Sequence, residues 1–210
     1  TPFSLPPQDH HLWQIQEGKQ LADKVFRKFN MKGIYCGVSS WEGDFWSNKK
    51  IKSPKDLKNF KLRYPGLEGE VMKLSGSRPV SLPGGELYRS LVSGSIDATN
   101  WLGPFHDKLM NFHEVAKYYY YPGVLTPSYA FYLHVNLDSW NSLDVEIQNK
   151  IEQVCETVAI DGINKLKKKD AKALQEIKAK GVYVEQLPKK VINKLESSWK
   201  EVAKQASDSS

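Results

Sequence analysis

The order of turns and apolar runs in residues 78–104 is the feature that most constrains the fold. Residues 78–82 read as a short strand, and the Pro-Gly-Gly turn at 83–85 opens a helix that Gly94 ends. Residues 96–98 then begin another strand. A strand, a helix and a strand in this order place strand ends and helix N-termini at one edge of a sheet, where open α/β folds bind ligands. The block therefore predicts a site that holds a molecule.

The rest of the chain continues the alternation of helices and strands, with no internal repeat and no long linker. Its 210 residues, 40% of them hydrophobic, can bury one core or two small lobes. Further predicted helices cover residues 8–29, 68–74, 142–180 and 188–204. Further predicted strands cover residues 34–38, 60–63, 130–136 and 181–185. We therefore predict an α/β protein with a mostly parallel sheet.

Local signals predict where helices begin and end and which residues of the first helix lie in the core. Ser53 as N-cap and Pro54 at the first helical position mark a helix start. Gly33 is predicted to end the segment that holds the helix at 8–29. The predicted core positions of that helix are Leu12, Ile15, Leu21, Val25 and Phe26.

Charge and hydropathy argue against a nucleic-acid partner and against a membrane-spanning segment. The net charge is +6, and its densest source is the lysine-rich run at 165–172, which contains no aromatic residue. The apolar residues in and around the run fit one helix face, so we interpret the lysines as a solvated face and predict no nucleic-acid partner. The positive balance would instead help to attract an anionic solute. No stretch approaches the roughly 20 apolar residues of a membrane span, and the first residues show no signal peptide.

The two cysteines could form at most one disulfide. Cys36 lies in an apolar run and Cys155 in a helical run, and their sequence positions do not place them within bonding distance. We expect two buried free thiols that pack as small hydrophobes. Neither a Cys-x-x-Cys motif nor metal-binding Cys/His spacing occurs.

Arg63 is the strongest candidate for binding an anion. It ends a predicted strand and precedes the turn at 64–66, which would expose its guanidinium at the edge of the sheet. A planar guanidinium can hold a carboxylate through two parallel hydrogen bonds. The alternative is a surface arginine at a strand end, which is our interpretation of Arg78 and Arg89.

Catalytic residue types are present, but no catalytic motif arranges them. There is no Gly-x-Ser-x-Gly, no His-Glu-x-x-His and no phosphate loop, and Gly84-Gly85 lacks the third glycine of a dinucleotide fingerprint. We therefore predict that the protein is not an enzyme. The residues that could in principle supply a nucleophile, base or acid are Ser39, Ser40, Glu86, Asp97, His106, Asp107 and His113.

Four segments carry a specific resemblance to a known family: residues 51–63, 65–71, 82–101 and 115–123. They resemble the periplasmic solute-binding proteins of tripartite ATP-independent (TRAP) transporters, of the DctP type, close to members that bind 2-oxo acids and other organic acids. With weaker agreement elsewhere, the resemblance covers nearly the whole chain. It implies a two-lobed periplasmic binding protein-like fold with mostly parallel sheets and long C-terminal helices, and it implies Arg63 as the carboxylate anchor.

The resemblance also implies a division into lobes and a first-lobe segment that precedes residue 1 in relatives. On this basis residues 1–17 are a remnant of the first lobe, 18–101 the second lobe, 102–141 a return through the first lobe, and 142–210 a connecting helix with a C-terminal helical scaffold. The chain would cross between lobes near residues 101–105 and again in the helix that starts near 142. Without the preceding segment, the first lobe would expose apolar surface and unpaired sheet edges.

A metal site is a further implication of the resemblance. Relatives hold an ion with a glutamine, a glutamate and the main-chain carbonyl of the adjacent tryptophan. In this sequence Asn100 stands at the glutamate position next to Trp101, and Glu42 stands at the glutamine position. These oxygen ligands suit Na⁺ or Ca²⁺ bridging protein and solute, with Glu42 and Asn100 facing each other near Arg63. The alternative is a solvated Glu42, no metal, and Asn100 in direct contact with the solute.

Aromatic residues are predicted to cover the apolar part of the solute. The candidates are Trp101, Trp46, Phe105 and, from the tyrosine run at 118–121, Tyr120, with Trp41 as an alternative to Trp46. Successive side chains on a strand point to opposite faces, so at most two of the four tyrosines can serve. The alternative for each aromatic residue is a position in the core.

The combined prediction is a periplasmic protein that captures a small organic carboxylate, such as a 2-oxo acid or a hydroxy acid. It would close on the solute by hinge motion and deliver it to the membrane subunits of a TRAP transporter, as a monomer or dimer. No cofactor is expected apart from the Na⁺ or Ca²⁺ ion. Two alternatives stay open: a carboxylate-sensing module that acts on a signalling partner, and a hydrolase or lyase that uses the same cleft.

Overall fold

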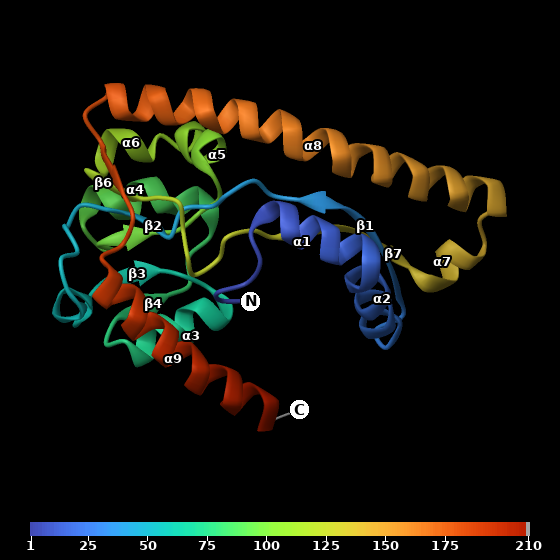
Figure 1. Cartoon of the computed structure of the whole chain (residues 1–210), viewed down its shortest axis with the longest axis horizontal. Helices are drawn as coiled ribbons and strands as arrows, with labels where there is room; N and C mark the ends of the chain where they lie inside the picture. Colours follow the sequence, from blue (N-terminus) through green and yellow to red (C-terminus); the bar gives the residue numbers. More distant parts are fainter. Residues whose placement is uncertain (209–210) are drawn as a thin grey trace. The chain divides into compact units, whose positions relative to one another are not determined.

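The computed structural model describes residues 1–208, which form two compact units (Figure 1). Unit 1 consists of Thr1–Ser4, Trp41–Pro127 and the chain from Asp170 onward, and unit 2 consists of Leu5–Ser40 and Ser128–Lys169. These boundaries differ from the expected ones at residues 18, 102 and 142. Residues 101–105, expected as a crossing, lie inside unit 1, whereas the long helix contributes to both units. The assignment of segments to a first and a second lobe stays a prediction.

Unit 1 contains a six-stranded sheet with the strand order β4-β3-β5-β2-β6-β8. The strands are β2 (Phe45–Ser47), β3 (Lys61–Arg63), β4 (Arg78–Val80), β5 (Ala98–Thr99), β6 (Tyr118–Tyr120) and β8 (Tyr183–Glu185). β3 is parallel to β4 and β5, and β6 is parallel to β8, whereas β2 is antiparallel to both of its neighbours. The expected α/β class with a mostly parallel sheet is confirmed for this unit.

Helices cover both faces of this sheet, and each face has its own core. The helices of the unit are η2 (Pro54–Leu57), α3 (Gly66–Leu74), η3 (Gly84–Glu86), α4 (Leu87–Ser93), α5 (Pro104–Leu109), α6 (Phe112–Val115), the end of α8 (Val145–Ala179) and α9 (Lys189–Asp208). One core joins Phe45 and Tyr120 to α3 and α9. The other joins Trp46 and Tyr119 to α4, α6 and α8. Neighbouring residues of β2 and β6 therefore point to opposite faces, as strand geometry requires.

Several local signals are confirmed. The Ser53 and Asp56 side chains form a capping box at the start of η2, and Gly94 ends α4 in the left-handed conformation with φ 71°. The expected strand at 130–136 is β7 (Ala130–Asn136), and the long helix α8 begins at Val145 rather than at Ser142. Among the helices of residues 1–208, none has both the length and the apolar composition that a membrane span needs.

Unit 2 is built on a two-stranded antiparallel sheet of β1 (Met31–Val38) and β7. The predicted helix at 8–29 is present as a continuous run of α1 (Pro7–Trp13), the π-helix η1 (Gln14–Gly18) and α2 (Lys19–Arg27). Gly33 does not end this segment: it lies within β1, where the Phe26 ring packs so closely that a side chain at 33 would collide with it. The remaining elements of this unit are α7 (Leu137–Asn141) and the first part of α8.

The predicted core face of that first helical run is largely wrong. Leu12, Ile15, Leu21 and Val25 are 39–51% exposed, and only Phe26 is half-buried. Leu21 and Val25 lie in α2, a regular amphipathic helix of which no residue is buried, so the helix is present but its apolar positions stay exposed. The buried positions are instead Gln14 and Gly18. Unit 2 thus exposes large apolar side chains on α2, and others on β7 and α8.

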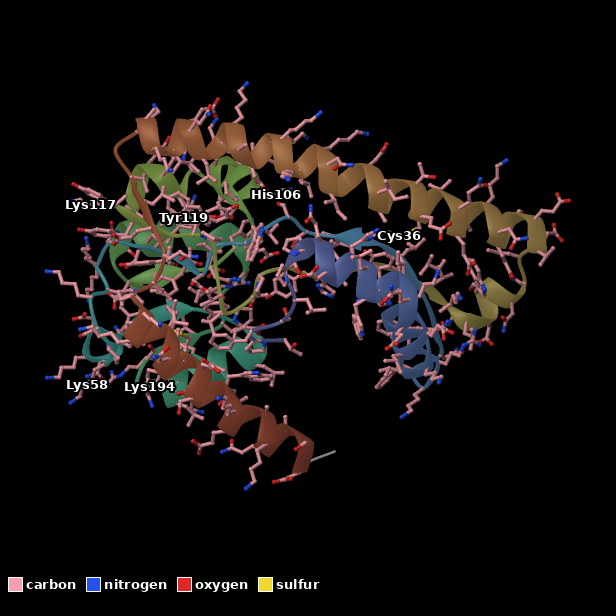
Figure 2. All side chains as sticks on the ribbon, in the orientation of Figure 1. Cys36, Lys58, His106, Lys117, Tyr119 and Lys194 are labelled. Carbon is pink, nitrogen blue, oxygen red and sulfur yellow. A yellow bond between two sulfur atoms is a disulfide. The ribbon has the colours of Figure 1, made fainter. Side chains whose placement is uncertain are left out.

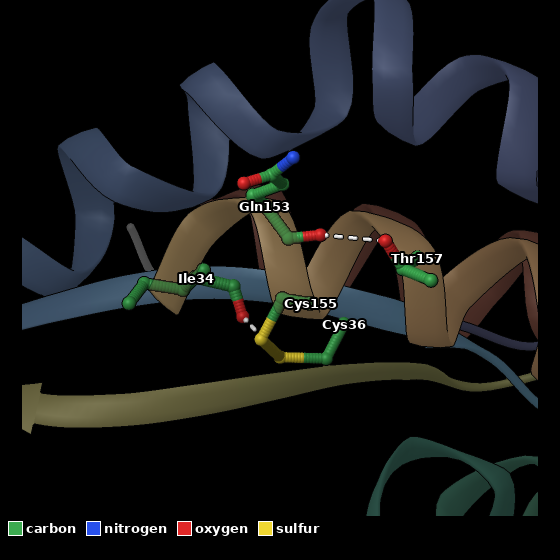
Figure 3. The surroundings of a disulfide bond; sticks show 5 residues. All are labelled: Ile34, Cys36, Gln153, Cys155 and Thr157. Carbon is green, nitrogen blue, oxygen red and sulfur yellow. Dashed lines mark hydrogen bonds between the residues drawn. A yellow bond between two sulfur atoms is a disulfide. The ribbon is translucent and has the colours of Figure 1, made fainter. Parts of the chain in front are cut away.

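The expectation of two free thiols is also wrong, because Cys36 and Cys155 form a disulfide between β1 and α8 (Figure 3). The ladder of β1 and β7 shifts register between Tyr35 and Gly37, which places Cys36 at a bulge. Gly37 has φ +138°, and a Cβ there would lie 3.3 Å from the Ala159 Cα. Small residues therefore let the helix approach the strand, and Cys155, one turn before Ala159, comes within bonding distance of Cys36.

Candidate functional site

The Arg63 guanidinium is held by neutral groups at the end of β3. Its Nη1 donates to Asn100 Oδ1 at 3.1 Å and to the Asn100 main-chain oxygen at 3.4 Å, and its Nε donates to the Leu82 carbonyl at 3.4 Å. The guanidinium carbon lies 5.6 Å from the centre of the Trp101 ring, within range of a cation–π interaction. These contacts orient the guanidinium at the edge of the sheet.

The order of the parallel strands explains why these residues meet. Arg63 pairs with Thr99 of β5 on one side and with Val80 of β4 on the other. The residues that directly follow β5 and β4 therefore lie beside the end of β3, and the Asn100 N–H donates to the Arg63 carbonyl at 3.2 Å. A Cβ at Gly84 would lie 2.7 Å from the Trp101 ring, so glycine at this turn makes room for the indole. The predicted block thus forms the carboxyl edge of three parallel strands, the usual ligand edge of an α/β sheet.

Glu42 lies in the loop before β2, and hydrogen bonds join this loop to the loops after β5 and β6. The Gly43 N–H donates to the Leu102 carbonyl, after β5, at 3.1 Å. The Gly123 N–H, after β6, donates to the Glu42 carbonyl at 2.7 Å. Glu42 has no exposed surface, so the alternative of a solvated loop carboxylate is wrong. The opposition of the Glu42 and Asn100 side chains stays a prediction.

Two other buried carboxylates hold neighbouring loops. Asp44 Oδ1 accepts hydrogen bonds from Val124 and Leu125, both at 2.8 Å, and burial raises the pKa of its carboxyl to about 7. Asp107, in α5, accepts from Trp46 Nε1 at 2.8 Å and from the Leu102 N–H at 2.9 Å. Burial likewise raises the pKa of the Asp107 carboxyl to about 7. The sequence indicated Asp107 only as a residue type that could supply a base or acid, because its partner Trp46 is distant along the chain.

The raised pKa of Asp107 predicts that acidification from pH 7 towards pH 4 stabilises the fold at this site. The carboxyl has a pKa of about 7 when folded, against its usual 3.8, so the native chain binds more protons than the unfolded chain between these values. The contribution to the unfolding free energy is therefore largest below pH 4 and falls as pH rises, by about 1.4 kcal/mol per pH unit. Urea denaturation at several pH values should show a steeper fall in wild type than in Asp107→Asn. Equal slopes of unfolding free energy against pH in the two proteins would contradict the raised pKa of Asp107.

The structure places the predicted aromatic residues in different surroundings. The Trp101 ring lies against the Arg63 guanidinium. Trp46 and Tyr120 are fully buried, and they lie in the cores on opposite faces of the sheet. Phe105, at the start of α5, is half-buried, with its ring centre 5.1 Å from that of His106. His106 is labelled in Figure 2. The alternation of strand residues explains why Tyr120 cannot share a face with Trp46.

A cavity of about 430 Å³ lies elsewhere, in unit 2, and contains none of the predicted site residues. Its lining includes Lys32, Asp23 and Glu152. Lys32 Nζ lies 3.2 Å from Glu152 Oε1 and 3.8 Å from Asp23 Oδ1. Because Lys32 pairs with these two carboxylates, we place the candidate site at Arg63 and not in this cavity. In residues 1–208, no group of three or more His, Cys, Asp or Glu side chains is arranged to hold a metal ion.

Comparison with known proteins decides the family. A family model described as bacterial extracellular solute-binding protein, family 7 (DctP), matches residues 1–209. The chain belongs to this family. The resemblance carried by residues 51–63, 65–71, 82–101 and 115–123 is thereby confirmed. The family consists of solute-binding proteins, which agrees with the prediction that the chain is not an enzyme.

Named relatives give the family a chemical context. The chain is 35% identical over 182 residues to a monocarboxylate 2-oxoacid-binding periplasmic protein of Nostoc sp., covering 86% of this chain and 50% of the relative. A TRAP transporter solute-binding protein of Bordetella bronchiseptica, with calcium and picolinate, matches at TM-score 0.93 and 29% identity, covering 99% of this chain and 62% of that one. A Colwellia psychrerythraea protein with calcium and pyruvate matches at TM-score 0.93 and 29% identity, covering 100% and 64%. The chain thus spans about half to two thirds of the length of these relatives.

Proposed function

We propose that the chain is part of a TRAP-type solute-binding protein that captures a small organic carboxylate through Arg63. The observation that carries this proposal is the guanidinium held in place by Asn100, Leu82 and Trp101 at the ligand edge of the sheet. An oriented guanidinium makes two parallel hydrogen bonds to a carboxylate at a low cost in side-chain entropy. The relatives described as binding 2-oxo acids, pyruvate and picolinate support a monocarboxylate. We therefore favour a 2-oxo acid as the solute class.

The donor set fits a hard cation bound together with the solute. Glu42 supplies a buried carboxylate. Its loop is hydrogen-bonded to Leu102, and the main-chain carbonyl of the preceding residue, Trp101, is the third candidate ligand. An amide oxygen has two lone pairs, so Asn100 Oδ1 can accept from Arg63 and also bind a cation. Na⁺ or Ca²⁺, as in solved relatives, would supply positive charge between Glu42 and an anionic solute.

Replacing Glu42 with glutamine is expected to weaken both cation and solute binding. A buried carboxylate next to a bound carboxylate is tolerable when a cation lies between them, and the neutral amide removes the main charge that holds this cation. Calorimetric titration with pyruvate, with Ca²⁺ and after chelation, should show that the substitution lowers affinity and abolishes the Ca²⁺ dependence. Glu86→Gln, the same change at an exposed position, should leave both unchanged. Unchanged or improved affinity in Glu42→Gln would show that there is no cation bridge and that Asn100 contacts the solute directly.

The disulfide agrees with an exported location. Disulfides such as that between Cys36 and Cys155 form and persist in oxidising compartments such as the bacterial periplasm. We place the protein there, with the solute as one partner and the membrane subunits of a TRAP transporter as the other. Genes for such subunits beside the gene of this protein would support transport, and an adjacent signalling kinase would support the sensing alternative.

A thermal-shift screen tests the proposed function. A solute that binds only the native chain raises its melting temperature by mass action. Pyruvate and other 2-oxo acids, 2-hydroxy acids, sugar acids and sulfonates should be compared with and without Ca²⁺. We expect 2-oxo acids to give the largest increase, greater with Ca²⁺ than without it. A screen in which no carboxylate raises the melting temperature would refute the proposal.

A further inference from the structure

We propose that Asp107 is a positioning residue that fixes the loop at 100–103, and with it Asn100 and Trp101, against Arg63. This inference rests on the proposed function, because the loop matters for the solute only if Arg63 binds it. Asp107 accepts hydrogen bonds from Leu102 and Trp46. Its effect on the site would pass through Leu102, the residue that directly follows Trp101.

The carboxylate of Asp107 holds the main chain of this loop from one side. Its Oδ1 accepts from the Leu102 N–H at 2.9 Å, and the Leu102 carbonyl accepts from the Gly43 N–H at 3.1 Å. Leu102 is thus fixed at both of its peptide groups, on one side by α5 and on the other by the loop of Glu42. Asp107 is only 1% exposed, so bulk water does not compete for its hydrogen bonds.

The other carboxylate oxygen connects the loop to the rigid core. Asp107 Oδ2 accepts from Trp46 Nε1 at 2.8 Å. Trp46 is fully buried in β2 and stacks on Tyr119 of β6 with 4.1 Å between ring centres. Burial, together with the nearby Asp107 carboxylate, raises the pKa of the Tyr119 hydroxyl well above its usual value. Trp46, predicted from the sequence as a solute contact, would therefore act on the site from within the core, through Asp107.

The chemistry of these partners requires a group with two acceptor oxygens. The Leu102 N–H and the Trp46 Nε1–H are both donors, and they bind different oxygens of the carboxylate. An asparagine has the same shape but replaces one acceptor oxygen with an NH₂ group, which would face a donor. The charged and titratable groups around Asp107 are Asp170, Tyr119 and Tyr121. Asp170 Oδ1 accepts from the Phe105 N–H at 2.8 Å and so holds the start of the helix that carries Asp107.

The test compares Asp107→Asn with Ser75→Ala in the full chain. Ser75 is a matched control, because it is also buried in unit 1 and its Oγ hydrogen-bonds Ser198 Oγ at 3.0 Å, but it has no described link to the loop. Calorimetry with pyruvate and Ca²⁺ should show an affinity about 10- to 100-fold lower in Asp107→Asn, since a buried donor is left without an acceptor. Ser75→Ala should bind like wild type. Amide hydrogen exchange should become faster at residues 101–103 in Asp107→Asn and stay unchanged in the sheet.

The pattern of amide hydrogen exchange distinguishes a local effect on the loop from a general loss of stability. Faster exchange throughout unit 1, as a general loss of stability would give, overturns the proposal, and so does wild-type affinity in Asp107→Asn. If Asp107→Asn does not fold, Trp46→Phe takes its place, because it removes one donor and keeps an aromatic ring against Tyr119. It should produce the same local exchange pattern, and an unchanged loop would overturn the proposal. If no carboxylate of the thermal-shift screen binds the wild type, the proposed function is refuted instead, and exchange at 101–103 would then decide alone whether Asp107 positions the loop.

Discussion

Arg63→Lys is expected to lower the affinity for pyruvate roughly thirtyfold or more, with the fold intact. Losing a bidentate contact to a desolvated carboxylate costs about 2 to 5 kcal/mol. A lysine keeps the charge but is a point donor, so it cannot reproduce the planar pair of hydrogen bonds. It would also lose the set of hydrogen bonds to Asn100 and Leu82 that orient the guanidinium beside Trp101. Arg63→Ala should abolish detectable binding.

Calorimetric titration measures this effect, and the melting temperature checks the fold. Arg78→Lys is the matched control: Arg78 begins β4, next to β3, but is exposed and has no predicted contact with the solute. It should bind pyruvate like wild type. Near wild-type affinity in Arg63→Lys would remove Arg63 from its role as anchor. Another group at the same edge of the sheet would then have to be the one that binds the carboxylate.

Loss of the disulfide should be the largest single change in stability. The bond joins residues 119 positions apart, and in the chain-entropy account a closed loop of this size stabilises the fold by about 5 kcal/mol. Cys36→Ser with Cys155→Ser, or reduction of the wild type, should therefore lower the urea midpoint of unfolding strongly. A two-stranded sheet is only marginally stable by itself. The sheet of β1 and β7 therefore depends strongly on the disulfide that joins β1 to α8.

A thiol-labelling experiment provides the control for this prediction. Under denaturing conditions, the unreduced chain should take up no maleimide, and the reduced chain should take up two labels, one for each cysteine. Addition of reductant to the double serine variant should leave its unfolding curve unchanged. A wild-type chain that is fully labelled without reduction, or equally stable with and without reductant, would contradict the prediction.

Elements with local signals were predictable from the sequence. The capping box at Ser53, the left-handed Gly94 and the strand at 130–136 depend on residues a few positions apart, whose interactions do not require the rest of the fold. The position of Arg63 at a strand end followed in the same way. A mostly parallel sheet also followed from the strand and helix pattern, but its order β4-β3-β5, which brought Arg63, Asn100 and Trp101 together, came from the tertiary structure.

The tertiary structure decided which faces are covered and which distant groups meet. The sequence made Leu12, Ile15 and Leu21 candidate core positions, but all three stay exposed, and a π-helix interrupts the run. The sequence also could not say which strand α8 would contact, and so could not pair Cys36 with Cys155. Nor could it bring Asp107 to Trp46, 61 residues earlier in the chain. The physical reason is common to all three: burial and long-range bonding depend on which elements become neighbours, and packing between elements, not the local sequence of either, decides that.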